Sequence, residues 1–168
     1  MYQIGDYLVY GSEGVCRVEN IGSPKLTGVS RDKLYYTLAP CRGGGVIYTP
    51  VDTGVHMRVP LEAAALEELL ERLPELPLCE NFPREPRLLA SFYQQILQTH
   101  DCVSILQLYK TLYTKQQALM GNRKSLNATD QRYWKQAEDL LCSEFGFVLG
   151  LERPQVVRLL KQKIGESL

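Results

Sequence analysis

The first sixty residues alternate short apolar runs with turns rich in glycine and proline, a pattern typical of a small β domain. Five such runs occur, at 7–10, 15–21, 34–38, 46–49 and 57–59. Gly43-Gly44-Gly45 separates the third run from the fourth and predicts a hairpin turn. Short strands divided by turns predict a strongly bent sheet or a small barrel, which encloses few side chains. We therefore expect a binding surface here rather than a substrate cavity.

From residue 61 the apolar period becomes that of an α-helix. A stretch rich in Ala, Leu and Glu covers 61–73, and four prolines follow within 74–86, a segment that we interpret as a stiff linker. Four apolar stripes with helical spacing come next, and they begin at Leu89, Ile105, Trp134 and Val156. These stripes predict a compact helical bundle with Trp134 in its core.

Local signals mark where the bundle helices begin and end. Asp101 is placed to cap the second helix, and Asn127 followed by Asp130 resembles a capping box for the third. Gly121 and Gly150 stand where helices are expected to stop. The helix boundaries are therefore predicted independently of the apolar stripes.

The two patterns together predict an α+β fold, a small amino-terminal β-barrel followed by a compact all-helical domain. The expected boundaries are a β domain at 1–60, a helix and Pro-rich linker at 61–86, and a helical domain at 87–168. With 45% hydrophobic and 23% charged residues, the composition is that of a globular protein with a core. The sequence has no apolar run of the roughly 20 residues that a membrane-spanning helix needs, and no visible signal peptide. We expect a cytoplasmic protein with no membrane contact.

Residues with catalytic potential are sparse. The triple glycine lacks the following Lys-Ser/Thr of a phosphate-binding loop. His100 stands beside Asp101 at a helix junction, where we expect a local turn role, and the chain has only two histidines. The five cysteines are scattered without a C-x-x-C pair, which favours buried reduced thiols over a metal site. We expect no enzymatic activity, no cofactor or metal, and no small-molecule substrate.

The formal net charge of zero is unevenly distributed. Residues 1–78 carry 7 Lys/Arg and 10 Asp/Glu, whereas residues 79–168 carry 12 and 9. The basic residues around the predicted bundle are Arg84, Arg87, Lys110, Lys115, Arg123, Lys124, Arg132 and Lys135. Such a set fits either a solvated helical surface or a phosphate-binding one. Arg123 and Lys124 are the better phosphate candidates, because they precede a capped helix start whose free N–H groups favour anions.

Phe82 is an isolated aromatic residue in the Pro-rich segment, close to Arg84 and Arg87. One interpretation is a packing residue that closes the bundle. The other is an exposed apolar wedge beside basic residues, the combination that some proteins insert between base steps in the minor groove. The residues alone leave both interpretations open.

An ordered set of segments resembles the CarD/CdnL family of bacterial transcription regulators. Residues 2–10 and 14–18 are similar to the opening of that family, and 35–38 and 46–52 to its next strands. The similar segments of the second half are 112–113, 124–126, Asp130, 137–141 and 144–145. The resemblance covers nearly the whole chain.

The resemblance implies a Tudor/SH3-like domain that binds the RNA polymerase β subunit, followed by a helical domain that contacts promoter DNA at the upstream edge of the melted bubble. The polymerase-binding positions would fall on Pro24, Lys25, Ile47 and Tyr48. The family's usual wedge, a Trp, would fall on Phe82, a departure that keeps a flat ring but offers less area. The remaining DNA-contacting positions would be Arg84, Arg87, Lys115, Arg123, Lys124 and Lys135, with contacts mainly to the backbone and the minor groove.

These observations lead to one hypothesis and one alternative. The hypothesis is a non-enzymatic transcription regulator that binds polymerase through its amino-terminal domain and promoter DNA through its helices, and so modulates the stability of the open complex. The alternative is a protein–protein adaptor that binds polymerase or another partner without engaging DNA. Near-neutral charge and the missing Trp favour the alternative.

Overall fold

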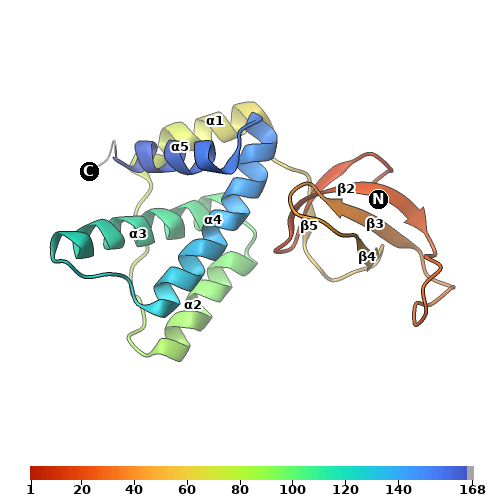
Figure 1. Cartoon of the computed structure of the whole chain (residues 1–168), viewed down its shortest axis with the longest axis horizontal. Helices are drawn as coiled ribbons and strands as arrows, with labels where there is room; N and C mark the ends of the chain where they lie inside the picture. The colour runs from red at the N-terminus through yellow and green to blue at the C-terminus, as the bar shows by residue number, and fades with distance from the viewer. Residues whose placement is uncertain (166–168) are drawn as a thin grey trace. The chain divides into compact units, whose positions relative to one another are not determined.

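The computed structural model of the protein describes residues 1–165 and divides the chain into two compact units. The first unit is Met1–Leu61 and the second begins at Glu62 (Figure 1). The first is built from strands and the second from helices, which confirms the predicted α+β fold class.

A five-stranded antiparallel sheet makes up the first unit. Its strands are β1 (Tyr7–Tyr10), β2 (Gly14–Gly22), β3 (Tyr35–Pro40), β4 (Ile47–Pro50) and β5 (Met57–Arg58). Their order across the sheet is β4-β3-β2-β1-β5, so β4 and β5 form its two edges. All five predicted strands are present within two residues of the expected bounds, and the triple glycine lies in the β3–β4 hairpin connection.

The sheet curves around a small core. Leu8, Cys16, Val18, Tyr36 and Leu38 are buried together at its centre. A register shift between Val18 and Asn20 interrupts the long strand β2, and bulges of this kind bend a strand and increase its twist. Because the sheet bends, side chains from its different strands meet on the inner face and bury one another there.

The second unit is a helical bundle centred on α4. Its elements are α1 (Ala63–Arg72), the 3₁₀ turn η1 (Leu73–Glu75), α2 (Pro86–Gln98), α3 (Cys102–Gly121), α4 (Ala128–Leu149) and α5 (Arg153–Gly165). The helix α4 packs against α1, α2, α3 and α5 (Figure 1). None of the helices in residues 1–165 is both long and apolar enough to cross a bilayer.

The Pro-rich segment, predicted as a linker, is packed into the helical unit. The buried Lys110 ammonium donates to the carbonyl oxygens of Leu73 at 3.2 Å, Pro74 at 2.6 Å and Leu76 at 2.8 Å. One residue along α3, Thr111 Oγ1 accepts from the Cys79 N–H at 2.9 Å. The predicted surface position of Lys110 is therefore wrong, because its buried amine donates to main-chain carbonyls at the end of α1, in η1 and just after it.

The predicted helix ends are confirmed, with one correction. Asp101 accepts from the Ser104 N–H and Asn127 accepts from the Asp130 N–H, so both act as N-caps. Gly150 closes α4 in the left-handed conformation at φ +67°. Asp130 is not the second half of a capping box, because its buried carboxylate is engaged by side chains from α2 and α3.

Trp134 lies at the rim of the bundle core and is half-buried. Its ring packs 6.0 Å from the Tyr109 ring and 6.4 Å from the Tyr113 ring, centroid to centroid. The residues that continue its stripe along α4, Ala137 and Leu141, are buried. The prediction of a core position thus holds for the stripe and only in part for its first residue.

Candidate functional site

The edge strand β4 offers main-chain hydrogen-bonding groups to a partner. The Val51 N–H donates to the Leu34 carbonyl at 3.0 Å, which makes this pair the hydrogen-bonded kind in the β3–β4 ladder. Such pairs alternate along an antiparallel ladder, so Thr49 and Ile47 also direct their main-chain groups toward β3. Tyr48 and Pro50, between them, direct theirs away from the sheet.

Apolar side chains surround this open edge. Tyr48, Val46 and Leu34 are 43%, 53% and 51% exposed. Ile47 is half-buried and packs on the sheet core. Of the four predicted polymerase-binding residues, Ile47 and Tyr48 therefore share one strand, where Tyr48 supplies the exposed ring and Ile47 anchors the strand.

Pro24 and Lys25 lie in the loop between β2 and β3. The last residue of β2, Gly22, pairs with Tyr35, and Tyr35 pairs with Pro50. The loop therefore leaves the sheet at the same end as Pro50. A shallow hollow in the loop is lined by Ser23, Pro24, Lys25, Leu26, Thr27 and Arg31.

Phe82 is half-buried against aromatic residues of α2. Its ring centroid lies 5.3 Å from that of Phe92 and 5.9 Å from that of Tyr93, both in edge-to-face geometry. Arg84 and Arg87 nearby in sequence are exposed. The structure thus combines the two interpretations of Phe82, since the ring helps to close the bundle and also remains partly open to solvent.

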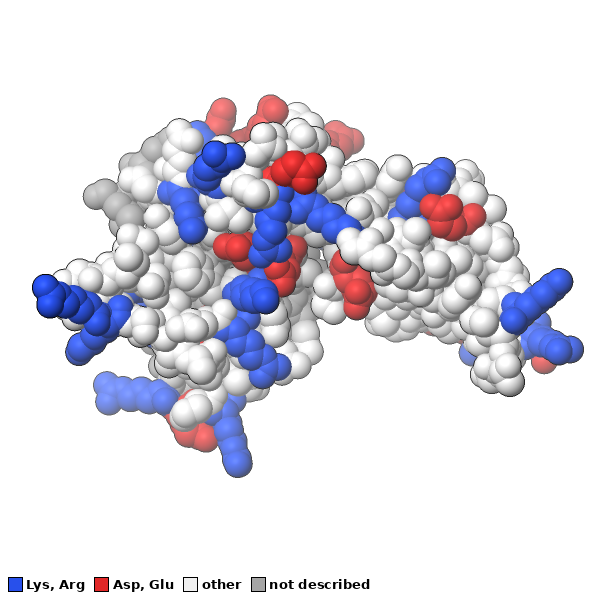
Figure 2. Space-filling view, viewed as in Figure 1, with Lys and Arg blue, Asp and Glu red and all other residues white. Residues whose placement is uncertain are grey.

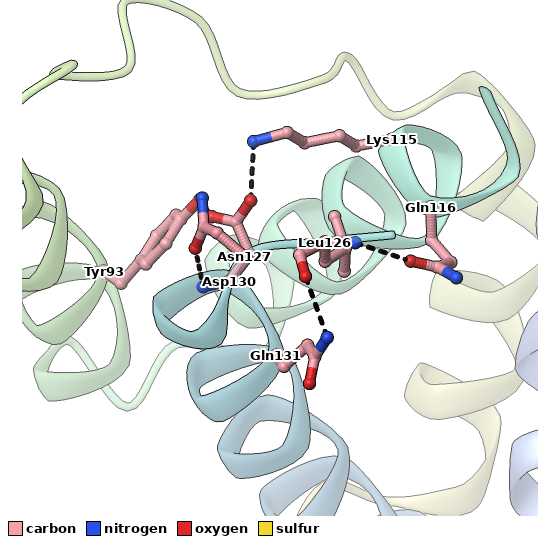
Figure 3. Close-up of polar contacts among 7 residues, drawn as sticks. All are labelled: Tyr93, Lys115, Gln116, Leu126, Asn127, Asp130 and Gln131. Carbon is pink, nitrogen blue, oxygen red and sulfur yellow. Dashed lines mark hydrogen bonds and ion pairs between the residues drawn. The ribbon is translucent and has the colours of Figure 1, made fainter. Parts of the chain in front are cut away.

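The carboxylate of Asp130 joins three helices (Figure 3). The Tyr93 hydroxyl of α2 donates to Oδ1 at 2.5 Å, and Lys115 Nζ of α3 lies 2.6 Å from Oδ2. Burial, and then the hydrogen bond to Asp130, raise the pKa of Tyr93, which keeps its hydroxyl protonated as a donor. Lys115 was expected to contact DNA, but its charge is already balanced by a fully buried carboxylate.

Side chains of α3 and α4 hold the main chain of the loop that carries Arg123 and Lys124 (Figure 3). Gln116 Oε1 accepts from the Leu126 N–H at 3.2 Å, and Gln131 Nε2 donates to the Leu126 carbonyl at 2.8 Å. The Leu126 side chain is buried, whereas Arg123 and Lys124 are exposed. Both cations are therefore displayed from a fixed loop immediately before the start of α4.

Further cations lie on the surfaces of α4 and α5. Figure 2 shows Lys and Arg side chains spread over the face of the helical unit that these helices form. Arg132 stacks over the Tyr133 ring at 5.4 Å, and Lys135 is exposed. Sequence reasoning passed over two of the four cations of α5, Arg158 and Lys161, because no loop or cap signal singles them out. Among residues 1–165, no cluster of His, Cys, Asp or Glu is arranged to hold a metal ion.

The sheet unit is similar to a known protein family. Residues 2–59 match the family model of the CarD-like/TRCF RID domain, which covers the whole five-stranded sheet. No curated protein matches the chain. The match agrees with the resemblance noted in the first half of the sequence, and it does not extend to the helical unit.

Proposed function

From the match of residues 2–59 to the CarD-like/TRCF RID domain family, we propose that the chain is a bacterial transcription regulator that couples RNA polymerase to promoter DNA. Domains of this family are non-enzymatic and interact with the polymerase β subunit. The open β4 edge is the observation that carries the proposal for this chain. The role would place the protein in the cytoplasm with the transcription machinery.

The docking mode that the edge favours is addition of a polymerase strand to β4. Such pairing draws its affinity from main-chain hydrogen bonds and its specificity from alternate side chains. Tyr48 supplies an outward N–H and C=O together with an exposed aromatic ring, and aromatic rings are common interface anchors. Pro24 and Lys25 would contact the same partner from the end of the sheet.

Two substitutions at one position separate the main-chain contribution from that of the ring. Tyr48→Ala removes the ring and keeps the outward N–H, whereas Tyr48→Pro removes both. Proline is tolerated at an edge position whose N–H faces solvent, so the sheet should remain folded. We expect weaker polymerase β binding for Tyr48→Ala and a further drop for Tyr48→Pro, measured by calorimetry and with circular dichroism as the folding control. Equal affinities for the two variants would refute strand addition.

The DNA-contacting part of the proposal assigns the phosphate backbone to the helical unit. Arg123 and Lys124 stand on a fixed loop before a helix start, and Arg84, Arg87 and Lys135 add exposed positive charge. Weak DNA affinity is sufficient, because docking on polymerase raises the effective concentration of this unit at the promoter. No base-specific contact is required.

The half-exposed ring of Phe82 is proposed to rest against a distorted base step. A ring inserted at such a step offsets part of the unstacking cost, which is of the order of a few kcal/mol. A melted promoter would gain from this contact and an intact duplex would gain little, so binding would favour the open complex.

The test of DNA contact is salt-dependent binding to forked promoter DNA. Replacing Arg123 and Lys124 together by Ala should weaken association and flatten the slope of log affinity against log salt, by roughly one unit for each phosphate that the variant no longer neutralises. A slope identical to that of the unchanged protein would exclude this loop as the DNA face. If the unchanged protein binds polymerase but no DNA at any salt concentration, the adaptor function replaces the regulator.

A further inference from the structure

A lysine of α5 lies over two packed aromatic rings, those of Tyr113 and Trp134, which we call the Tyr113–Trp134 shelf. Lys161 Nζ lies 6.0 Å from the ring centroid of Tyr113 in α3 and 6.0 Å from that of Trp134 in α4. The two rings themselves pack 6.4 Å apart. Cation–π attraction at this distance favours a defined position for the ammonium group, which otherwise sits on a flexible stem.

Two other cations of the bundle are paired with carboxylates, in contrast to those at this shelf. Lys115 is paired with Asp130, and Arg153 bridges Glu138 at 3.1 Å and Asp139 at 2.5 Å. Within residues 1–165, neither Lys161 nor Arg158 forms an ion pair with a carboxylate. Arg158 is exposed and lies three residues before Lys161, on the same side of α5. This part of α5 therefore has positive charge that no carboxylate of residues 62–165 pairs with.

We propose that Lys161 and Arg158 form a second phosphate-contacting segment, which extends the DNA surface of the helical unit from the Arg123–Lys124 loop onto α5. This inference rests on the proposed DNA-binding function and adds residues that neither the family match nor the sequence pattern indicates. The Tyr113–Trp134 shelf positions Lys161, and the ammonium keeps its hydrogen-bond donors for a phosphate oxygen.

Charge favours a nucleic-acid backbone as the occupant. Arg132 and Lys135 on α4 add exposed cations to the same helical pair, and Figure 2 shows Lys and Arg over α4 and α5 in one view. Cations distributed along adjoining helices suit a regularly charged polymer, whose binding grows with each phosphate neutralised. The half-buried indole of Trp134 is close enough to respond when Lys161 changes its partner.

The chain has a single tryptophan, so its fluorescence reports on this shelf directly. The full chain is titrated with a duplex and with a forked promoter oligonucleotide, and Trp134 emission and salt-dependent affinity are recorded. We expect DNA to change the emission of the unchanged protein. In the double variant Arg158→Gln with Lys161→Gln, the emission change at saturating DNA should disappear, the affinity should fall roughly 5- to 10-fold, and the salt slope should flatten by one to two units.

Three matched variants make the result specific. Arg72→Gln removes an exposed charge from the acid-rich helix α1 and should leave affinity and emission unchanged. Replacing Arg123 and Lys124 by Gln should lower affinity while the emission change at saturation persists. Lys161→Arg, made in the chain with Arg158 intact, keeps the charge and should therefore retain the emission response to DNA.

Other outcomes would overturn the inference. If the double variant keeps the affinity, salt slope and emission change of the unchanged protein, α5 takes no part in DNA binding, although the DNA-binding function itself stands. If the unchanged protein binds neither oligonucleotide, the proposed DNA function fails together with this inference. An emission change with polyglutamate and none with DNA would assign the surface to an acidic protein partner instead.

Discussion

The sheet unit and the helical unit present different kinds of chemistry to a partner. At the β4 edge the available groups belong to the main chain, because Tyr48 directs its N–H and C=O outward. In the helical unit the backbone is satisfied within helices, so the surface consists of side chains such as Arg123 and Lys124. A main-chain surface withstands side-chain replacement, whereas a surface of side chains depends on which residues remain and on their charge.

The two units should also differ in what unfolds them. Leu8→Ala opens a cavity in the small core of the sheet, where Leu8 is fully buried, and should cost about 2–5 kcal/mol. Because a small unit has little stability to lose, this substitution should unfold the sheet and abolish polymerase β binding. The helical unit should keep its amide protection in hydrogen exchange and its DNA binding. Val59→Ala, at an exposed position next to β5 on the other edge of the sheet, is the control. Loss of protection in both units would show that they do not fold independently.

Lys110→Met is the matching test of the helical unit. Methionine has a similar shape but removes the ammonium donor from the carbonyl oxygens of Leu73, Pro74 and Leu76, at a cost of about 2–4 kcal/mol. Of these three carbonyls, only that of Leu73 keeps another donor within residues 1–165, the Leu76 N–H. Burial lowers the pKa of Lys110, so part of the gain from its hydrogen bonds already offsets desolvation. Denaturant unfolding should report the loss, with polymerase β binding intact. Lys135→Met at an exposed position should change stability little. An equally small effect of Lys110→Met would show that the hydrogen bonds of Lys110 to these carbonyls contribute little to stability.

Phe82→Ala tests whether the helical unit acts on melted DNA. Removal of the ring should shorten the lifetime of an open complex by a few-fold, corresponding to roughly 1 kcal/mol, on a promoter with an unstable bubble. Phe82→Trp should restore or lengthen the lifetime, because the larger ring covers more base area. Polymerase binding should be unchanged in both variants. Unaltered lifetimes with the protein still bound would favour the adaptor function.

The free energy of unfolding of the sheet unit should depend on pH through Cys16. Burial, with a smaller contribution from Cys41, raises the pKa of Cys16 to about 11. An unfolded thiol ionises near pH 8.5, so between these values the folded state binds more protons and its stability falls as pH rises. The expected loss of unfolding free energy is roughly 1 kcal/mol at pH 9. The slope of stability against pH in this window should be shallower in Cys16→Ala, and equal slopes would assign the dependence to other groups.

Much of the fold followed from local patterns. Short apolar runs predicted all five strands, and Asp101, Asn127 and Gly150 predicted helix ends that the structure confirms. These signals are local because a strand pattern or a cap depends on residues a few positions apart. The sheet order and the outward direction of the Tyr48 main chain depend on register, which the sequence does not display.

The candidate site was less predictable, because its charges have distant partners. Lys110, Lys115 and Lys124 look alike in the sequence, yet the first contacts a cluster of carbonyls, the second pairs with a buried carboxylate, and the third is open to solvent. Asp130 looked like part of a cap because its spacing from Asn127 is right, whereas its carboxylate meets Tyr93 across the bundle. Whether a cation is available to a ligand depends on tertiary contacts that helical periodicity does not encode.

The open β4 edge also bears on self-association. Any unpaired edge offers a template to a second copy of the same chain, and sheets that extend in this way lead to aggregates. Here the strand has four residues, and of its two outward positions Pro50 has no N–H to give. Tyr48 is then the single outward donor within β4, too little to hold a growing stack of identical edges. A short strand that ends in proline can thus accept one partner strand while resisting edge-to-edge polymerisation.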